Sequence, residues 1–361
     1  MAINKKAKDL YNLMFDGAET WFANTISSLM EWRFLKKYLT KEPIPKAYKK
    51  QYKEYWKKYK KVSPRWGWYY ASRNGVYDPR YIPNTLYYSK IDQHFNDRKL
   101  GWGFNDKNYY SLIFSGVKQP EIVIRKINSL LYDENYILLT LEKAIKKIEA
   151  ETEIVCKPAL ETGSGRGIRF WEPKRDEREI YDFLLDKTQK DFVVQKVIRQ
   201  HKELNKIHDS SVNTIRICSL LMEDGVHILS SCLRMGVNNS RIDNVTSGGI
   251  SAGIDKNGML HKYAYTYYSG EKMDAHPQGF VYEGFTVPSY DRAIDLVKIC
   301  HPIIAHFRLV SWDIAIDEGG NPILIEANMR KGGINLHQFD NGPLFGELTD
   351  KVLDEVFSVK G

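Results

Sequence analysis

The stretch Trp312–Asn328 reads WDIAIDEGGNPILIEAN. It contains two short apolar segments, Trp312–Ile316 and Pro322–Ala327, separated by Asp317–Asn321. Gly-Gly followed by Asn is typical of a tight turn, because these residues adopt positive φ at low cost. The sequence therefore predicts a β-hairpin with two strands of alternating side chains.

Three polar side chains interrupt this apolar hairpin. Closing the hairpin brings Asp313 on one strand close to Glu326 on the other, and Glu326 and Asn328 share a face because side chains alternate along a strand. Two carboxylates and an amide oxygen form an all-oxygen set, which suits Mg²⁺ held partly by substrate phosphates. The alternative is a surface hairpin with polar ends, and the pattern by itself does not separate the two.

The length and composition indicate a large folded protein. The chain has 361 residues, of which 43% are hydrophobic, so we expect two or three lobes with a sizeable core. Four cysteines in this length do not form a disulfide framework. We expect reduced core thiols at Cys156, Cys218, Cys232 and Cys300. The chain shows neither a signal segment nor an apolar run of about 20 residues, so we expect a cytoplasmic protein.

The positive charge is concentrated in one segment. The net charge of the chain is +8, yet residues 31–62 hold twelve Lys or Arg against three Glu, a balance of +9. Lys46–Val62 is helical in pattern, with a stripe of Tyr48, Tyr52, Tyr55, Trp56 and Tyr59 and lysines on the other faces. These lysines indicate either a solvated face or contact with an anionic membrane or a polyanionic glycan. We expect no nucleic-acid partner.

The rest of the first hundred residues is helical and then rich in aromatic side chains. Lys5–Leu39 has apolar residues at helical spacing, and residues 64–104 form an aromatic, turn-rich run. Such a run packs on its own aromatics or offers a platform to a planar or sugar ligand. We expect it to cover the acceptor side of a cleft, with Arg73, Arg80 and Arg98 available to bind an acidic substrate.

A glycine loop follows a strand in the middle of the chain. Thr152–Lys157 reads as a strand and runs into residues 158–171, where Gly163, Gly165 and Gly167 alternate with two polar residues. Glycines let backbone N–H groups approach phosphate oxygens, and Lys157 adds positive charge. Many hairpins share this pattern, and it is not a Walker A loop.

Further polar residues follow on predicted strands and loops. We expect a strand over Asp191–Ile198, a hairpin of Ser211–Met222 and Val226–Met235, a loop-rich segment over residues 236–258, and helices over Asp176–Asp186, Asp291–Phe307 and Leu348–Phe357. Lys107 stands at a helix start, next to an acidic cap. Arg216 and Arg234 lie on the hairpin, and Arg330 opens a second glycine loop.

The order of these parts resembles the ATP-grasp superfamily over about residues 100–345, and its sugar-transfer-associated family most. The segments that carry the resemblance are FNDKNYYSLIF (104–114), VCKPALETGSGRGIRF (155–170), VVQKVIRQHKELNKIHDSSVNTIRI (193–217) and LIEANMRKGGINLHQFDNGPLFG (324–346). The resemblance implies an α+β fold in which two α+β lobes grip ATP, preceded by a helical, aromatic-rich extension. The expected domains are residues 1–100 (extension), 101–195 (first lobe with the flap) and 196–361 (C-terminal lobe with the metal site).

The resemblance also implies roles for individual residues. It assigns ATP binding to Lys107, Lys157, the flap residues Gly163, Ser164, Gly165, Arg166 and Gly167, the hinge residues Gln195, Lys196 and Val197, and Asn213. It assigns magnesium binding to Asp313, Glu326 and Asn328. It assigns the transferred phosphoryl group to Arg234, with Arg216 and Arg241 as rivals for that role. It assigns substrate binding to Arg241, Asn244, Gly248, Gly249 and Arg330. The ribose partner is left open between Glu203 and Asp209.

Three functions are open at this point. The first is an ATP-dependent ligase that activates a carboxylate as an acyl phosphate for attack by an amine, joining an amino acid or amine to an acidic sugar in surface polysaccharide biosynthesis. The second is a kinase that phosphorylates a sugar or an alcohol. The third is a non-catalytic basic binding module. The ligase chemistry needs ATP and Mg²⁺ and no covalent protein nucleophile. A cytoplasmic location at the inner face of the membrane would suit it.

Overall fold

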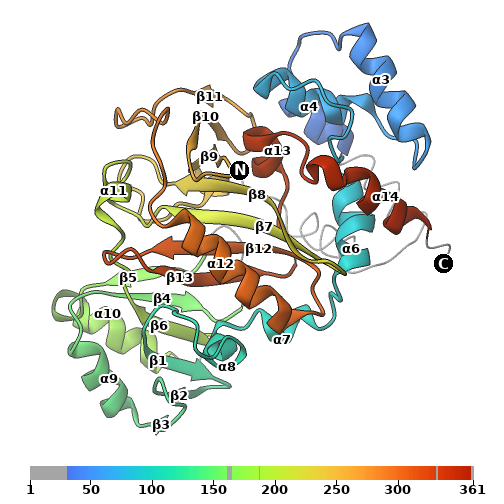
Figure 1. Ribbon diagram of the computed structural model, residues 1–361. Coiled ribbons are helices and arrows are strands. Elements are labelled where there is room, and N and C mark those ends of the chain that lie inside the picture. The colour runs from blue at the N-terminus through green and yellow to red at the C-terminus, as the bar shows by residue number, and fades with distance from the viewer. Residues whose placement is uncertain (1–30, 161–164, 187, 331, 359–361) are drawn as a thin grey trace.

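The computed structural model describes residues 31–160, 165–186, 188–330 and 332–358 (Figure 1). Its two sheets contain only antiparallel strand pairs, one sheet with six strands and the other with seven. Helices pack on both sheets, and the N-terminal segment forms a separate helical layer beside the larger one. The expected α+β class with a helical, aromatic-rich extension is therefore confirmed.

The smaller sheet has the strand order β3-β2-β1-β6-β4-β5. Its strands are β1 (Ile122–Ile127), β2 (Leu130–Tyr132), β3 (Leu138–Leu139), β4 (Ile154–Pro158), β5 (Arg169–Trp171) and β6 (Phe192–Lys196). Helices α9 (Leu141–Glu149) and α10 (Pro173–Leu185) cover one face, where Ile148, Trp171 and Ile180 share a core. The central strand β6 lies next to β4, so Lys157 stands opposite Val193.

The larger sheet has the order β11-β10-β9-β8-β7-β12-β13. Its strands are β7 (Thr214–Met222), β8 (Gly225–Met235), β9 (Ile250–Ile254), β10 (Leu260–Thr266), β11 (Lys272–Met273), β12 (Leu309–Ile316) and β13 (Pro322–Asn328). Helix α12 (Tyr290–Cys300) packs on one face through Ala293, Val297 and Cys300. The helix expected over Asp291–Phe307 ends earlier, because Pro302 follows and a 3₁₀ turn begins at His301.

The segment 236–258 is not loop throughout. Strand β9 lies inside it and is buried along its whole length, paired with β8 on one side and β10 on the other. Two of its five residues are Ala and Gly, and both of its faces are covered, so the sequence shows no polar–apolar alternation.

The hairpin of β12 and β13 forms as predicted. Gly320 has a φ of 74°, and the Asp317 carboxylate accepts a hydrogen bond from the Asn321 backbone N–H at 2.8 Å. Asp313 pairs directly with Glu326 in the register of the two strands. The first strand begins at Leu309, three residues before the predicted start, and all eight of its residues are buried.

The N-terminal extension packs on the other face of the large sheet. It contains α3 (Lys46–Lys57), α4 (Pro64–Asn74), α5 (Asn84–Leu86), a π-helical turn (Tyr87–Ile91), α6 (Asp92–Phe95) and α7 (Gly101–Phe104). Its aromatic side chains share one core with α13 (Asn335–Asn341), α14 (Thr349–Ser358) and strand residues of the sheet. The aromatic run is therefore largely helical and mostly core. Of the helix expected over Lys5–Leu39, residues 1–30 lie outside the described part of the chain, and residues 31–38 are helical.

Three arginines of the extension are not available to a substrate, contrary to our expectation. Arg73 donates to the backbone carbonyls of Tyr38 and Tyr69. Arg80 pairs with Asp78, and Arg98 pairs with the buried Asp92. Arg73 also donates to the Ser269 carbonyl, and Arg80 also pairs with Glu347, so these two arginines tie the extension to the rest of the chain.

Two predictions about the chain as a whole can also be compared with the structure. All four cysteines are buried and free, as expected for reduced core thiols. In the described ranges, no helix combines the length and the apolar character needed to cross a bilayer.

Candidate active site

A large cavity lies between the two sheets and reaches the N-terminal extension. Its volume is about 2180 Å³. Pockets for one small ligand usually measure ~300–1,000 Å³, so this cavity has room for more than one molecule. Strands β4 and β5 form one wall, strands β7, β8, β12 and β13 form the opposite wall, and side chains of the extension border one end.

The carboxylate hairpin forms the floor of the cavity. Asp313 is buried and accepts hydrogen bonds from Arg216 at 2.6 and 2.9 Å, while Arg234 lies 3.2 Å away. Glu326 accepts a hydrogen bond from Lys107 at 2.8 Å. Burial by itself would raise the pKa of Asp313, but the two guanidinium groups outweigh it and hold that pKa below its usual value. Both carboxylates are therefore neutralised by cations that face the cavity.

The same hairpin offers the donor set that Mg²⁺ prefers. Among the described residues there is no cluster of three or more His, Cys, Asp or Glu able to hold a metal, so a site here rests on two carboxylates and the amide of Asn328. The Asn328 amide nitrogen lies 3.4 Å from an Asp313 oxygen. The amide must turn for its oxygen to join a shared ion. The residues fit magnesium in chemical type, with substrate oxygens or water completing the shell.

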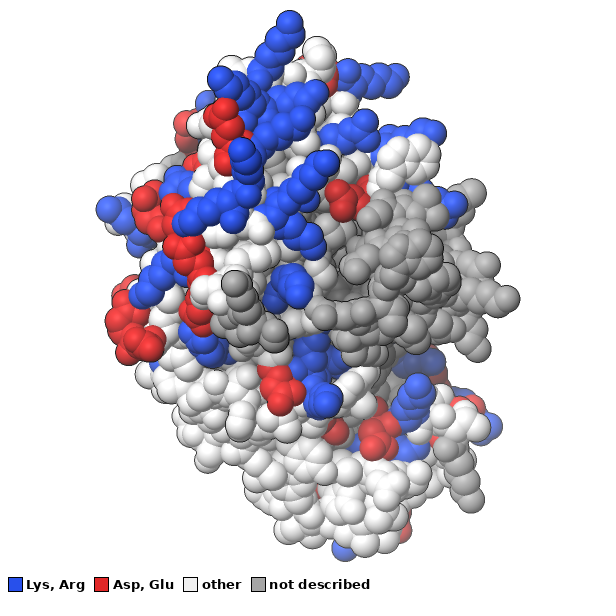
Figure 2. All heavy atoms as spheres, turned by 90° about the vertical axis from the view of Figure 1, so that its right-hand side faces the viewer, with Lys and Arg blue, Asp and Glu red and all other residues white. Residues whose placement is uncertain are grey.

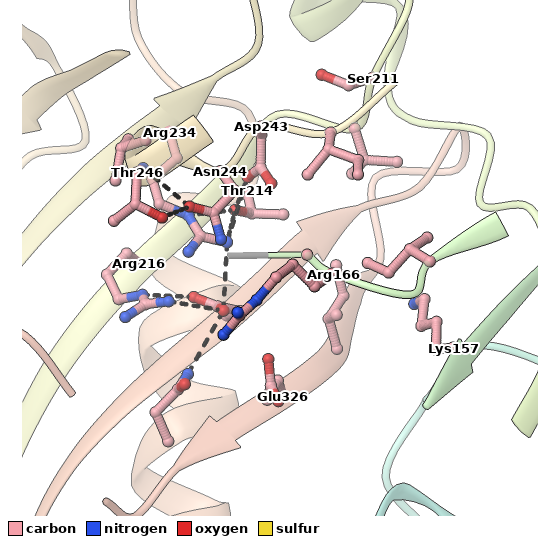
Figure 3. Close-up of a pocket in the computed structure, with 18 of the residues that line it drawn as sticks. Lys157, Arg166, Ser211, Thr214, Arg216, Arg234, Asp243, Asn244, Thr246 and Glu326 are labelled. Atoms are coloured by element: carbon pink, nitrogen blue, oxygen red, sulfur yellow. Dashed lines mark hydrogen bonds and ion pairs between the residues drawn. The ribbon is translucent and has the colours of Figure 1, made fainter. Parts of the chain in front are cut away.

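Arg234 belongs to a network that the sequence analysis did not identify. It donates to the Thr214 hydroxyl at 2.8 and 3.0 Å and forms an ion pair with Asp243 at 3.3 Å. Thr214 also donates to Asp243. Thr214 stands two residues before Arg216, so the two side chains lie on the same face of β7. This alternation is the signal by which Thr214 could be found from the sequence. Asp243 directly precedes Asn244, which was expected at the site. The network fixes the Arg234 head group beside Asp313 (Figure 3).

Two lysines add positive charge on the side of the carboxylate hairpin opposite Arg216 and Arg234. Lys107 begins a 3₁₀ turn (Lys107–Tyr109) capped by Asp106, just before α8 (Tyr110–Ile113). Lys157 lies on β4 and lines the cavity. Its surroundings and the neighbouring Lys107 lower the pKa of Lys157 to about 8, because an ammonium is disfavoured in a poorly solvated site beside a like charge. An incoming phosphate would relieve this unfavourable charge.

The glycine loop after β4 approaches the same space. Gly165 and Gly167 have φ values of 67° and 83°, the left-handed region that favours glycine. A Cβ on Gly167 would stand 2.9 Å from the Pro158 side chain. Arg166, between them, lines the cavity, and in the view of Figure 3 its side chain extends from the loop toward the side of Arg216, away from Lys157. Gly163 and Ser164 lie outside the described residues.

The cavity brings together most of the residues expected at the site. Those that line it are Lys107, Lys157, Gly165, Arg166, Gly167, Lys196, Val197, Arg216, Arg234, Arg241, Asn244, Asp313, Glu326, Asn328 and Arg330. Of the two acids considered for the ribose, Asp209 lines the cavity, whereas Glu203 pairs with Lys206.

Four expected site residues are not among the described residues that line the cavity, and the roles expected of them stay predictions. Asn213 is fully buried and donates to carbonyl oxygens of Leu204 and His208, so it shapes the preceding loop. Gln195 is buried within β6. Gly248 and Gly249 do not line the cavity, and a Cβ on Gly249 would stand 2.7 Å from a backbone oxygen of Asp243.

Arg241 has a different position from the one expected of a substrate ligand. It forms an ion pair with Glu153, at the start of β4, and its guanidinium lies 4.0 Å from the ring centroid of Phe170 on β5. Arg241 follows strand β8 of the large sheet, so these contacts join the two walls of the cavity.

Comparison with known protein families identifies this architecture. A family model described as sugar-transfer associated ATP-grasp matches residues 87–352. The chain belongs to the sugar-transfer associated ATP-grasp family. The match includes both sheets and every described residue of the carboxylate and arginine cluster, which confirms the resemblance seen in the sequence. A comparison with curated protein sequences found no match for this ATP-grasp chain.

Three solved structures that are similar to this ATP-grasp chain are distant from it in sequence. The ADP complex of N5-carboxyaminoimidazole ribonucleotide synthetase has 12% identity, a TM-score of 0.38 and coverage of 63% of this chain and 45% of its own. D-alanine–D-alanine ligase from Bacillus anthracis has 15% identity, a TM-score of 0.38 and coverage of 76% and 69%. Biotin carboxylase from Campylobacter jejuni has 14% identity, a TM-score of 0.44 and coverage of 71% and 47%. This chain therefore spans less than half the length of two of these proteins.

Proposed function

We propose that this protein is an ATP-dependent ligase that activates a carboxylate as an acyl phosphate for attack by an amine. The observation that carries the proposal is the arrangement around Asp313. Arg216 and Arg234 stand on one side of the cavity, Lys107 and Lys157 stand on the other, and the carboxylate hairpin lies between them. This arrangement suits a reaction in which negative charge gathers on phosphoryl oxygens.

The residues of the chain act by position and charge. Lys157 and the backbone of Gly165 and Gly167 are placed to hold nucleotide phosphates, and the segment Lys196–Val197 borders the cavity where adenine would pair with the backbone. Magnesium bound at Asp313, Glu326 and Asn328 would neutralise phosphate charge and orient the transferred group. Arg234, fixed by Thr214 and Asp243, is the residue we assign to the transferred phosphoryl group, with Arg216 holding Asp313.

The substrates we propose are an acidic sugar as the carboxylate and an amino acid or other amine as the acceptor, in surface polysaccharide biosynthesis. The family description refers to sugar transfer. The volume of the cavity supports two molecules bound together. A kinase acting on a sugar hydroxyl would use the same charges, and it is the second candidate function.

The deciding experiment is to trap the activated carboxylate. Protein, ATP, Mg²⁺ and a panel of uronic acids are incubated with hydroxylamine in place of the amine. A ligase releases ADP and phosphate and forms a hydroxamate, whereas a kinase releases ADP and leaves a phosphorylated sugar. Glu326→Gln serves as the inactive control. Failure of the wild-type protein to bind ATP with magnesium in calorimetry would contradict both functions.

We also propose that α3 contacts an anionic membrane at the cytoplasmic face. Tyr48, Tyr52 and Trp56 are buried against the extension, while five lysines of the helix are exposed: Lys46, Lys49, Lys50, Lys53 and Lys57. Figure 2 shows Lys and Arg side chains gathered on the upper part of the side of the molecule that carries α3. Because the aromatic stripe is used in packing, the attraction is electrostatic and would weaken as salt increases.

Liposome flotation tests the membrane contact. We expect the protein to float with vesicles containing phosphatidylserine and to stay behind with phosphatidylcholine vesicles. Replacing Lys46, Lys49 and Lys53 by Gln should abolish flotation. The matched control replaces lysines of α9, Lys143, Lys146 and Lys147, which lie on the small lobe. Equal binding to both vesicle types, or equal loss in both variants, would contradict the contact.

A further inference from the structure

One carboxylate of the cavity wall is not part of the cluster around Asp313. Glu31 belongs to the helical residues 31–38 of the N-terminal extension and lines the cavity. The Thr85 hydroxyl donates to its carboxylate at 3.1 Å. In the described part of the chain Glu31 has no ion-pair partner, whereas Asp313 and Glu326 are both paired with cations. Glu31 is therefore a negative group that a cationic ligand could neutralise.

The surroundings of Glu31 oppose its charge. The side chain is half-buried, and burial raises the pKa of Glu31 by more than its neighbours Thr85, Trp66 and Lys60 lower it. These neighbours belong to the extension and are not the cations that surround Asp313. A cation bound beside Glu31 would favour the ionised carboxylate, so binding would relieve an unfavourable charge.

Aromatic rings flank this carboxylate. Phe34 stands three residues after Glu31 in the same helical segment, so the two side chains lie on one face, and both line the cavity. The Phe34 ring stacks on the ring of Trp66, which also lines the cavity, with the centroids 5.7 Å apart. One carboxylate offers too few oxygens for a metal ion, whereas a carboxylate beside aromatic faces suits an organic ammonium group.

One wall of the cavity joins this carboxylate to the reaction site. Thr85 follows Asn84, whose amide nitrogen donates to the side chain of Asn335 at 2.8 Å, at the start of α13. Three residues earlier, the Gly332 carbonyl accepts a hydrogen bond from Arg216 at 3.0 Å. Several residues therefore separate the extension carboxylate from the carboxylate hairpin, and a single ligand must be extended to reach both.

The proposed reaction limits which nitrogen Glu31 can hold. An uncharged amine attacks the carbonyl carbon of the acyl phosphate, the C–N bond forms, the C–O bond to phosphate breaks, and phosphate takes the proton that the nitrogen loses. A carboxylate beside the attacking nitrogen would stabilise its protonated form and oppose the attack. Glu31 therefore suits an ammonium group that does not react.

We propose that the acceptor is an amine with a second, cationic amino group, such as a diamine, and that Glu31 binds this second group as an ammonium ion. The proposal rests on the function proposed above and deepens it by naming the class of acceptor. Phe34 and Trp66 border the bound ammonium. The N-terminal extension then forms part of the active site.

Calorimetry with matched probes tests the proposal. The protein is saturated with a non-hydrolysable ATP analogue and magnesium, and then titrated with 1,4-diaminobutane or 1,5-diaminopentane, or with the amino alcohol of the same length. We expect a diamine to bind at least about tenfold more tightly than its amino alcohol, because the hydrogen bond to Glu31 is then made by a charged donor. Glu31→Gln should bring each pair of probes within about twofold and leave the affinity for the ATP analogue unchanged.

Glu318→Gln is the matched control. Glu318 also lines the cavity, is exposed, and lies in the turn of the carboxylate hairpin. A general attraction of a dication to an acidic cavity would be weakened by both substitutions, whereas a site at Glu31 is lost only in Glu31→Gln. Charge reversal provides a second variant: Glu31→Lys should bind 5-aminopentanoate more tightly than 1,5-diaminopentane, because the charge at the far end of the probe must then be negative.

The outcomes separate this proposal from the function on which it rests. If the wild-type protein does not bind the ATP analogue, the proposed function is wrong. If the analogue binds but neither diamine binds more tightly than its amino alcohol, the acceptor assignment is overturned while the nucleotide site stands. Equal loss of the preference in Glu31→Gln and Glu318→Gln would also overturn the assignment to Glu31.

Discussion

Arg216 lies directly opposite Asp313 on adjacent strands, and its Nε and Nη2 donate to the two carboxylate oxygens at 2.6 and 2.9 Å. Both residues are held by paired strands, β7 and β12, inside the large sheet, so the geometry is set by the fold and not by a loop. A bidentate pair of this kind is directional as well as strong. The negative charge of the hairpin is therefore oriented before any substrate arrives.

Glu326→Gln should keep the fold and remove most of the turnover. The substitution is nearly isosteric, and Glu326 is only partly buried, so we expect a change in the free energy of unfolding below about 1 kcal/mol. Loss of a group that stabilises transition-state charge typically lowers the rate by about 10²–10³-fold. Steady-state kinetics with urea unfolding as the fold control measures both effects. Asn328→Ala should lower the turnover rate less than Glu326→Gln does, because water can replace a neutral metal ligand.

Asp313→Asn should differ from Glu326→Gln by also destabilising the protein. Asp313 is buried, and its loss leaves Arg216 and Arg234 facing each other without their shared carboxylate. Removing one partner of a buried ion pair typically lowers the free energy of unfolding by about 3–5 kcal/mol. Urea unfolding measures this cost, with Asp354→Asn as the control because its pair with Lys58 is exposed. Equal stability of the two variants would show that Asp313 is not needed to balance the arginines.

Lys157→Met should stabilise the nucleotide-free protein and abolish nucleotide binding. The pKa of Lys157 is lowered to about 8 by its surroundings and by Lys107, so the folded state holds fewer protons than the unfolded state between about pH 8 and pH 10. Stability of the wild-type protein therefore rises with pH across this range. At pH 7 the variant should be more stable by about 1–2 kcal/mol. This value is smaller than the full pKa shift implies, because Lys157 lines a cavity that is open to solvent. The gain in stability should shrink toward pH 10. Urea unfolding at both pH values checks the sign.

Arg241→Ala should weaken nucleotide binding without affecting the fold. Arg241 joins the two walls through Glu153 and Phe170, and each contact is partly exposed. An exposed ion pair and a cation–π contact together contribute about 1–1.5 kcal/mol, so the Kd for ATP should rise about five- to tenfold. The control is Arg169→Ala, because Arg169 has the same two kinds of partner, Glu179 and Phe183, within the small lobe. If both variants bind ATP alike, the contacts of Arg241 do not hold the walls together.

The carboxylate hairpin could be predicted because its information is local. The turn residues Asp317–Asn321 fix the hairpin, and the hairpin fixes Asp313 opposite Glu326. Lys157 and the glycine loop were found for the same reason, since a strand and the loop that follows it are neighbours in sequence.

The partners of these residues could not be predicted, because they depend on the order of strands in the sheet. Arg216 and Asp313 are 97 positions apart and meet only because β7 lies next to β12. Arg330 and Trp102 are 228 positions apart in the sequence and meet in the fold. Asn213 donates to a loop carbonyl, and a polar residue beside a strand gives the same signal in the sequence whether it faces a ligand or such a carbonyl.

A final prediction concerns Asp340, which lies outside the cavity. Asp340 is on α13, buried between this helix and the large sheet near Cys232 and Ser251. Burial raises the pKa of Asp340 to about 8, so the carboxyl is neutral in the folded protein at pH 7. The folded state then holds more protons than the unfolded state between about pH 4 and pH 8, and stability falls as pH rises through this range.

Asp340→Asn should remove this pH dependence. The amide is uncharged at every pH and close to the protonated carboxyl in size, so the variant should match the wild-type protein near pH 4. Between pH 6 and pH 9 the wild-type protein should lose up to about 2–3 kcal/mol that the variant retains, since each pH unit below the folded pKa corresponds to about 1.4 kcal/mol. Urea unfolding across this range measures the difference. A variant less stable than the wild-type protein at pH 9 would mean that Asp340 is ionised and paired in the folded state.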